Sequence, residues 1–353
     1  MKIISKQGPL FSESRYKDTK DPCPVYDGEM WHIFGSGGSV RDEKWKILHA
    51  ISPTLDGPWL ETDPVTLNGV SGDHVAAPGV WFDRETKTFH MFVQTDFLAI
   101  NGTVEYLESF DGKVFNKINT ALTSVPQTEE AGIYDPHPAI IFNQKYLIYS
   151  GTPRVQKENE KFVSKPDIFL AKSESNTWKG PWQRIGKILD HHAIAEHHNQ
   201  PDHPDYEWGI EGPQLIELPN RQILLNATCF LPEGKFGTRQ RTFFAIAKQV
   251  TGPYKTLGPV IHENLETWES GENGHAACVL IGKNLHLFYQ ARSQTMGDAQ
   301  SNDWRYGIAT FDISPLLKKP IAWEIIRLQV RIWKKILPYS VFSILKKLKG
   351  YIK

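Results

Sequence analysis

Short apolar runs alternate with polar turns along most of the chain. Five segments each contain two apolar runs of about four to eight residues around a short polar turn, which is the pattern of a β-hairpin. These segments are residues 23–37, 79–95, 139–151, 215–230 and 279–292. A third apolar run follows each of them, at residues 45–53, 104–110, 168–175, 242–250 and 306–314. The pattern therefore predicts one repeat of at least three strands that occurs five times.

A fourth strand is predicted in four of the five repeats. Three of them have a Gly-Pro-aromatic corner after the third run, at Gly57-Pro58-Trp59, Gly180-Pro181-Trp182 and Gly252-Pro253-Tyr254. The second repeat has Asp111-Gly112 in this place, and the fifth repeat has no such segment. Residues 2–8 are the candidate for the missing outer strand of the fifth repeat.

Four-stranded repeats at a spacing of roughly 55 to 75 residues are typical of propeller blades. We therefore predict an all-β fold, a five-bladed β-propeller over residues 1–315. A two-sheet sandwich is the alternative, but it does not explain why the Gly-Pro-aromatic corner recurs at the same point of the repeat.

The pattern changes in residues 316–353. From Ile321 to Ile352, apolar residues recur every three to four positions with Lys and Arg between them, which predicts two amphipathic α-helices separated near Pro338. Such helices, with Trp on the apolar face, are typical of segments that lie on an anionic membrane surface. Packing against the propeller or against a partner protein is the alternative.

Charge is unevenly distributed between these two regions. The whole chain has a formal net charge of zero, but residues 316–353 hold ten Lys or Arg and one acidic residue, so the preceding region is acidic. An acidic body would oppose binding to nucleic acid, which is not expected as a partner.

Composition indicates a large globular protein in a reducing compartment. The chain has 353 residues, of which 40% are hydrophobic and 23% are charged. Three widely separated cysteines, without metal-like spacing, predict neither a disulfide framework nor a zinc site. The first residues contain no apolar stretch of signal-peptide length. The expected location is the cytoplasm, with the tail at the inner face of the membrane.

Acidic residues stand near the start of three repeats. In a propeller the inner strand of each blade begins near the central axis, so these openings converge although they are far apart in sequence. They read Lys20-Asp21-Pro22, Ala77-Pro78-Gly79, Tyr134-Asp135-Pro136, Ile210-Glu211-Gly212-Pro213 and Asn273-Gly274-His275. Aligning the acids places Asp21, Asp135 and Glu211 at one point of the repeat.

Glycosidic bond cleavage uses two carboxyl groups in different protonation states, and a third acid nearby raises the pKa of the proton donor. The openings supply such a set. This pattern resembles glycoside hydrolase family 43 and the related five-bladed furanosidase, arabinanase and xylosidase propellers, over about residues 20–312. The resemblance implies that Asp21 is the general base, that Asp135 tunes the pKa and orients the acid, and that Glu211, in a Glu-Gly-Pro motif, is the general acid.

The same resemblance implies an inverting glycosidase that acts on a glycan containing a pentose or a furanose. Gly274-His275 matches the Gly-His pair of the last blade, whose imidazole lies near a central ion or water. Many relatives carry an acid after the proline where this chain has Gly79, a departure that bears on the substrate class. The Asn-Asp-Pro-Asn and Glu-Cys-Pro signatures of invertase-like families are absent.

Aromatic and basic residues near the openings are candidates for holding sugar rings. They are Trp31, His74, Trp81, Tyr134, Trp208, His275 and Arg292. No cofactor is required for the chemistry. If an ion is bound at the propeller centre, the expectation is a hard cation such as Ca²⁺, held near His275 mostly through water. The histidine-rich residues 190–205 are interpreted as a polar insertion at the pocket rim rather than as a metal site.

Two other functions stay open from the sequence. A related propeller could transfer the glycosyl group to phosphate or to another sugar, as a glycoside phosphorylase or transglycosylase, with Arg292 or the histidine-rich segment holding the phosphate. A non-catalytic propeller could instead bind glycans without turnover. Dependence of activity on phosphate distinguishes the first, and ligand binding without turnover distinguishes the second.

Overall fold

The computed structural model describes most of the chain before the predicted tail. The described residues are 1–11, 13–38, 45–72, 75–96, 102–153, 166–197, 209–232, 238–261, 265–293 and 303–317. Residues Lys2–Asp312 form one compact unit. Ser314–Leu317 form a single helical turn, α1, in a second unit. The predicted helices over residues 321–352 lie outside the described residues, so the domain boundary at residue 315 and the membrane association stay predictions.

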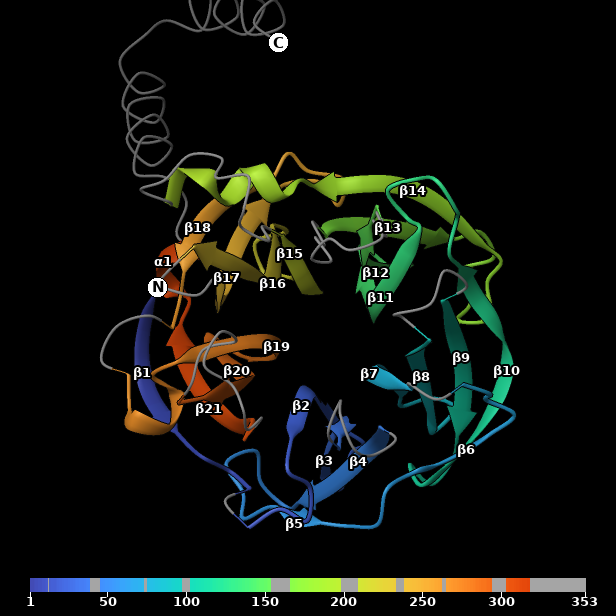
Figure 1. The fold of residues 1–353 in the computed structure, drawn as a ribbon, viewed down its shortest axis with the longest axis horizontal. Helices are drawn as coiled ribbons and strands as arrows, with labels where there is room; N and C mark the ends of the chain where they lie inside the picture. Colours follow the sequence, from blue (N-terminus) through green and yellow to red (C-terminus); the bar gives the residue numbers. More distant parts are fainter. Residues whose placement is uncertain are drawn as a thin grey trace, which may run out of the picture. The chain divides into compact units, whose positions relative to one another are not determined.

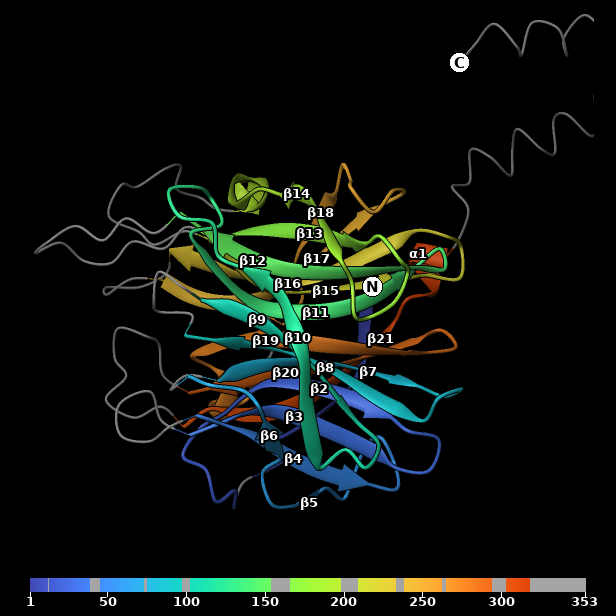
Figure 2. The ribbon, with the colours of Figure 1, turned by 90° about the vertical axis from the view of Figure 1, so that its right-hand side faces the viewer.

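Within the described residues, Lys2–Asp312 contain five β-sheets arranged around a central axis (Figure 1), which confirms the predicted propeller. The first strand of each repeat lies nearest to the axis, and in the side view the strands run from one face of the ring to the other (Figure 2). No helix among the described residues is long and apolar enough to cross a membrane.

Strands follow one another outward from the axis in the first two blades. The first blade consists of β2 (Thr19–Tyr26), β3 (Trp31–Gly37), β4 (Lys46–Ser52) and β5 (Leu60–Glu61). The second consists of β7 (Ala76–Asp83), β8 (Thr88–Thr95), β9 (Thr103–Ser109) and β10 (Val114–Thr123). The short strand β6 (Thr66–Asn68) pairs in parallel with β10 and gives this blade a fifth strand, which the repeat pattern does not predict.

The remaining blades have four strands each. The third consists of β11 (Gly132–Ile141), β12 (Gln144–Thr152), β13 (Asp167–Ser173) and β14 (Trp182–Leu189). The fourth consists of β15 (Ile210–Glu217), β16 (Ile223–Pro232), β17 (Thr238–Ala247) and β18 (Lys255–Pro259). The fifth consists of β19 (Glu272–Ile281), β20 (Asn284–Arg292), β21 (Arg305–Asp312) and β1 (Lys2–Gln7). The 3-10 helices η1 (His191–His197) and η2 (Thr267–Glu269) precede β15 and β19.

Alternation of side chains along each middle strand builds a core between neighbouring blades. In β12, Leu147 and Tyr149 pack into a cluster with residues of the second blade, whereas Ile148 between them packs into a cluster with the fourth blade. Successive side chains of a strand point to opposite faces of its sheet, so one apolar strand supplies both interfaces. This explains why the inner and middle strands read as nearly continuous apolar runs rather than as alternating ones.

The N-terminal strand closes the ring. β1 pairs antiparallel with β21, which confirms residues 2–8 as the source of the missing outer strand. Lys6 forms an ion pair with Glu269, and the hydroxyl of Tyr289 donates a hydrogen bond of 2.6 Å to the same carboxylate. The Glu269 side chain is fully buried. The ion pair between Lys6 and the buried Glu269 therefore stabilises the packing of β1 in the fifth blade.

Replacing Glu269 with Ala is expected to lower the free energy of unfolding by about 3–5 kcal/mol, because it removes the buried carboxylate that binds both Lys6 and the hydroxyl of Tyr289. Urea denaturation of Glu269→Ala measures the loss. Lys2→Ala, an exposed position on the same strand, is the control and should stay within about 0.5 kcal/mol of wild type. Equal effects of the two substitutions would show that the Lys6–Glu269 pair does not hold the ring closed.

Candidate active site

Every inner strand is interrupted by a bulge at the same position. The register shifts between Lys20 and Cys23, and it shifts at the corresponding place in the other four inner strands. One residue inside each bulge has a positive φ, and these are Asp21 (55°), Ala77 (48°), Asp135 (50°), Gly212 (59°) and His275 (38°). Positive φ is uncommon for residues with a side chain, and bulges re-aim side chains. All five residues line one pocket on the axis.

The structure corrects the alignment of the openings. Gly212, and not Glu211, is the equivalent of Asp21 and Asp135 in the bulge, so Glu211 stands one residue earlier in its blade. Glu211 was misplaced because the five openings were aligned by matching their acidic residues to one another. The better marker is the proline that follows the left-handed residue in four of the five repeats, because a residue before proline avoids the right-handed helical region.

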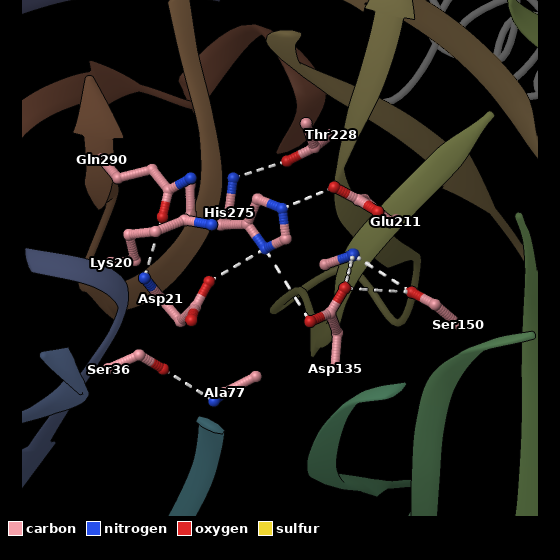
Figure 3. A network of polar contacts seen from close by, with 12 residues as sticks. Lys20, Asp21, Ser36, Ala77, Asp135, Ser150, Glu211, Thr228, His275 and Gln290 are labelled. Carbon is pink, nitrogen blue, oxygen red and sulfur yellow. Dashed lines mark hydrogen bonds and ion pairs between the residues drawn. The ribbon is translucent and has the colours of Figure 1, made fainter. Parts of the chain in front are cut away.

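Three acids from three blades nevertheless meet at one imidazole, as Figure 3 shows. Nδ1 of His275 lies 3.0 Å from Oδ1 of Asp21 and 3.8 Å from Oδ1 of Asp135. Nε2 of the same ring lies 2.6 Å from Oε1 of Glu211. The three acids were predicted to face one cavity. All of them reach His275, and Asp21 and Asp135 line the pocket, whereas Glu211 is not among its lining residues. Asp21 and Glu211 contact opposite nitrogens, so the width of the imidazole ring separates them.

The backbone of the fourth blade also binds Asp135. The N–H of Gly212 donates a hydrogen bond of 3.0 Å to Oδ2 of Asp135. The hydroxyl of Ser150 donates a longer bond of 3.4 Å to the same oxygen. Asp135 is therefore fixed by its own blade and by the strand that carries Glu211.

Asp21 is the strongly ionised acid of the cluster. Burial alone would raise its pKa, but the hydrogen bond and the charge of His275 act in the opposite direction, with smaller contributions from Lys20 and Ser36. Together they lower the pKa of Asp21 to about 2. This carboxylate is negatively charged throughout the physiological range, as a general base must be.

Asp135 has the opposite electrostatic environment. Burial raises its pKa to about 7, against the charge of His275 and with the support of the negative charges of Glu211 and Asp21. Burial would lower the pKa of His275, but the three acids raise it well above its ordinary value. At neutral pH the cluster therefore combines a charged imidazolium with an aspartate that is close to its own pKa.

The residues around His275 fit a calcium ion poorly. Ligand atoms of Asp21, Asp135 and His275 lie within 4.8 Å of one another. Calcium takes about six to eight oxygen ligands, and this group offers two carboxylates and a ring that holds its proton. The imidazolium itself supplies the positive charge that a central cation would bring.

Cys23, Pro136 and His137 are among the lining residues of the pocket that were not predicted as site residues. Cys23 and His137 are lining residues, and Sγ of Cys23 lies 3.8 Å from Nε2 of His137. Burial lowers the pKa of His137 to about 4, so this ring is neutral at physiological pH. Pro136, between Asp135 and His137, completes this side of the wall. His137 follows a predicted acid by two residues, and the bulge is what turns it toward the axis.

Trp31 and Trp81 lie away from the acids, in contrast to their predicted role in the same pocket. Both line a second cavity of about 960 Å³, formed by the C-terminal parts of the inner strands and the turns after them. An inner strand of eight residues at about 3.3 Å per residue separates its two ends by more than 20 Å. Proximity in sequence to an opening therefore did not place these side chains at the opening.

The other predicted binding residues have mixed outcomes. Tyr134 is buried next to Asp135. Arg292 is also buried, donates bonds of 2.9 Å and 2.7 Å to Glu272, and lies over the ring of Trp304. Its charge is thus paired inside the fifth blade and does not face the acids. His74 and Trp208 lie outside the described residues.

The histidine-rich segment is only partly described. Residues 191–194 pack against the outer edge of the fourth blade, where Ile194 is buried in the core and Thr256 of β18 bonds to Ala193. His191 is bound to Asp167 at 2.6 Å. This part of the segment is not at the pocket rim, contrary to the interpretation from the sequence, because Ile194 anchors it to the core. Residues 198–205 lie outside the described residues.

The fold is shared with solved glycoside hydrolases. An α-L-arabinofuranosidase from Podospora anserina, solved in complex with cellotriose, superposes with a TM-score of 0.60 at 14% identity, over 87% of this chain and 96% of that one. A thermostable family-43 glycoside hydrolase gives 0.60 at 16% identity, over 83% and 89% of the two chains. An α-L-arabinanase from Cellvibrio cellulosa, solved with arabinohexaose, gives 0.57 at 14% identity, over 83% and 92%.

No protein-family model and no curated protein matches the sequence. The similarity is therefore one of fold at low identity.

Proposed function

We propose that this protein is a glycoside hydrolase that cleaves a glycosidic bond with inversion of configuration. In this proposal Asp21 is the general base, Glu211 is the general acid, and Asp135 orients the acid and tunes its protonation. The observation that carries the proposal is the meeting of three acids from three blades at His275. Asp21, Asp135 and His275 line the pocket on the axis. The shared fold with arabinofuranosidases and arabinanases supports it.

The chemistry follows from the positions of the two outer acids. Glu211 donates its proton to the leaving oxygen while the bond between that oxygen and the anomeric carbon breaks. Asp21 takes a proton from a water molecule, whose oxygen bonds to the opposite face of the anomeric carbon. The lowered pKa of Asp21 keeps this group ionised and ready to accept the proton. Each turnover leaves Asp21 protonated and Glu211 ionised.

His275 provides a route for restoring the starting state. Its two nitrogens contact Asp21 and Glu211. The imidazolium can donate its Nε2 proton to Glu211, which leaves a neutral ring protonated at Nδ1. Asp21 then releases its proton to solvent, and Nε2 takes one proton from solvent. Asp21, Glu211 and the imidazolium thereby return to their starting protonation states with no net change in the number of protons.

The proposed substrate is a glycan that contains a pentose or a furanose. The support is the resemblance of the openings to family 43 and the fold shared with enzymes named for arabinose. Phosphorolysis has less support, because Arg292, one of the two candidates for holding phosphate, is paired with Glu272. The other candidate, the histidine-rich segment, lies partly outside the described residues.

Purified protein is expected to hydrolyse at least one member of a panel of nitrophenyl pentosides, with α-L-arabinofuranosides and β-D-xylosides at its centre, and of arabino- and xylo-oligosaccharides. Proton NMR of the first product anomer should show inversion. Products that form only in the presence of inorganic phosphate would show that the reaction is phosphorolysis and not hydrolysis. Binding of the oligosaccharides without turnover of any of them would contradict an enzyme function.

A further inference from the structure

The five bulge residues with positive φ share a second feature, which is the type of group that accepts a hydrogen bond from their backbone N–H. These residues are Asp21, Ala77, Asp135, Gly212 and His275. In each blade this N–H donates to a buried side chain on the second strand of the preceding blade. The acceptors are Gln290 for Asp21 (2.9 Å), Ser36 for Ala77 (2.7 Å), Gln94 for Asp135 (2.7 Å), Ser150 for Gly212 (3.2 Å) and Thr228 for His275 (2.5 Å). Figure 3 shows the contacts of Asp21 with Gln290, of Ala77 with Ser36 and of His275 with Thr228.

The acceptors occupy equivalent positions in their own sheets. Ser36 pairs with Lys20, Gln94 with Ala76, and Ser150 with Tyr134, each being the residue before the left-handed position. Thr228 pairs with Glu211, and Gln290 pairs with Gly274, in the same way. All five acceptor side chains are at most 4% exposed. The contact is therefore a property of the ring, repeated at every blade interface.

The type of acceptor residue depends on whether the residue with positive φ is an aspartate. The two left-handed residues that are aspartates, Asp21 and Asp135, have glutamine as the acceptor, whereas the other three have Ser or Thr. The hydroxyl residue of their own blade then binds the carboxylate, with Ser36 bound to Asp21 and Ser150 bound to Asp135. Each aspartate is thus held at its backbone by the preceding blade and at its carboxylate by its own blade.

We propose that Gln94 and Gln290 are positioning residues that fix the left-handed backbone of Asp135 and Asp21 and so aim both carboxylates at His275. This inference rests on the proposed function for its effect on turnover. The left-handed conformation is costly for a residue with a side chain, by roughly 1–2 kcal/mol. A buried N–H without an acceptor costs about 1–3 kcal/mol more, so loss of the glutamine favours a different backbone conformation.

Gln94→Met and Gln290→Met test the proposal, because methionine keeps the length of the side chain and removes the acceptor. Each is expected to lower kcat by about 10- to 100-fold with KM little changed, the effect of misplacing a reacting group by about 1 Å. Gln214→Met is the matched control. Gln214 is also buried and accepts the N–H of Cys278 in the next blade at 2.6 Å, but no acid stands there. It should lose a similar amount of stability and retain kcat.

Gln94→Thr and Gln94→Val form a second pair, for the case that the methionine variants do not fold. Both shorten the side chain equally, and only threonine offers the hydroxyl that Thr228 uses in the fourth blade. The proposal expects the threonine variant to be the more active. Equal kcat in this pair, or an equal loss of kcat in Gln214→Met and Gln94→Met, would overturn the proposal.

Titration of the carboxylate by carbon NMR, in protein labelled at the aspartate carboxyl carbons, separates this inference from the proposed function. The Asp135 signal is assigned from its loss in Asp135→Asn. Gln94→Met is expected to shift the Asp135 midpoint, because the carboxylate turns away from the charges of His275, Glu211 and Asp21 that act on it, whereas Gln214→Met leaves it in place. An unchanged midpoint overturns the positioning role even if no substrate is hydrolysed, and a shifted midpoint supports it in the same case.

Discussion

Glu211→Gln is expected to lower kcat on an oligosaccharide by about 10²- to 10⁴-fold, because an amide of the same shape cannot donate the proton that the leaving oxygen needs. On a nitrophenyl glycoside the loss should be much smaller, since nitrophenolate leaves without being protonated. Asp21→Asn should show a similar loss on both substrates, because activation of water is needed whatever the leaving group. Steady-state kinetics of both variants on both substrates therefore assign the acid and the base separately.

Glu217→Gln is the control for these experiments. Glu217 lies on the same strand as Glu211, six residues further along, and accepts the backbone N–H of Phe142 at 2.7 Å, a bond that glutamine can also accept. Its kinetics should match wild type. If Glu211→Gln were equally impaired on the nitrophenyl glycoside and on the oligosaccharide, Glu211 would not be the general acid. Full activity of Asp21→Asn would show that Asp21 is not the general base.

The fold was readable from the sequence because each blade is a local structure. Its hairpins are contiguous in the chain, and the turns between apolar runs mark them directly. Closure by residues 2–8 was also predictable, since only the fifth repeat lacks an outer strand, and β1 fills that place. The strand β6 was missed because three residues with few contacts leave no periodic signal.

The candidate site was predictable only in part. Convergence of Asp21, Asp135 and Glu211 follows from rotational symmetry, but the direction of a side chain near an opening depends on a one-residue bulge. The bulge shifted the register, so Glu211 was aligned with residues that are equivalent to Gly212. The glutamine acceptors could not be found from the sequence, because their partners lie far away in the chain and belong to another blade.

The missing acid after Pro78 has a steric reason in this chain. A Cβ atom at Gly79 would lie 2.2 Å from the carbonyl oxygen of Pro136 and 2.8 Å from Cα of His137. The backbones of β7 and β11 approach each other too closely for any side chain. The departure from the family pattern at Gly79 is therefore built into the packing of the second and third blades.

Asp135→Asn is expected to stabilise the protein at pH 8 while it lowers activity. The folded-state pKa of Asp135 is raised to about 7 from an ordinary 3.8, so the folded protein holds this proton more tightly than the unfolded chain does. The stability tied to this proton is fully present below about pH 4 and is lost as the pH rises through about 7. Asparagine carries no charge to bury. The variant should gain about 2–4 kcal/mol at pH 8, and the gain should vanish below about pH 4.

Asp21→Asn is expected to change stability in the opposite direction at pH 8, although Asp21 belongs to the same cluster. The pKa of Asp21 is lowered to about 2, so its contribution to stability is present above an ordinary pKa of 3.8 and is lost as the pH falls toward 2. Denaturation at pH 4, 6 and 8 should therefore show Asp21→Asn destabilised at pH 8 and Asp135→Asn stabilised. If both variants were less stable than wild type at pH 8, the Asp135 carboxylate would stabilise the fold, contrary to this prediction. A variant that is more stable and less active would show instead that the third blade retains a buried carboxyl at a cost to stability, because the chemistry at His275 requires it.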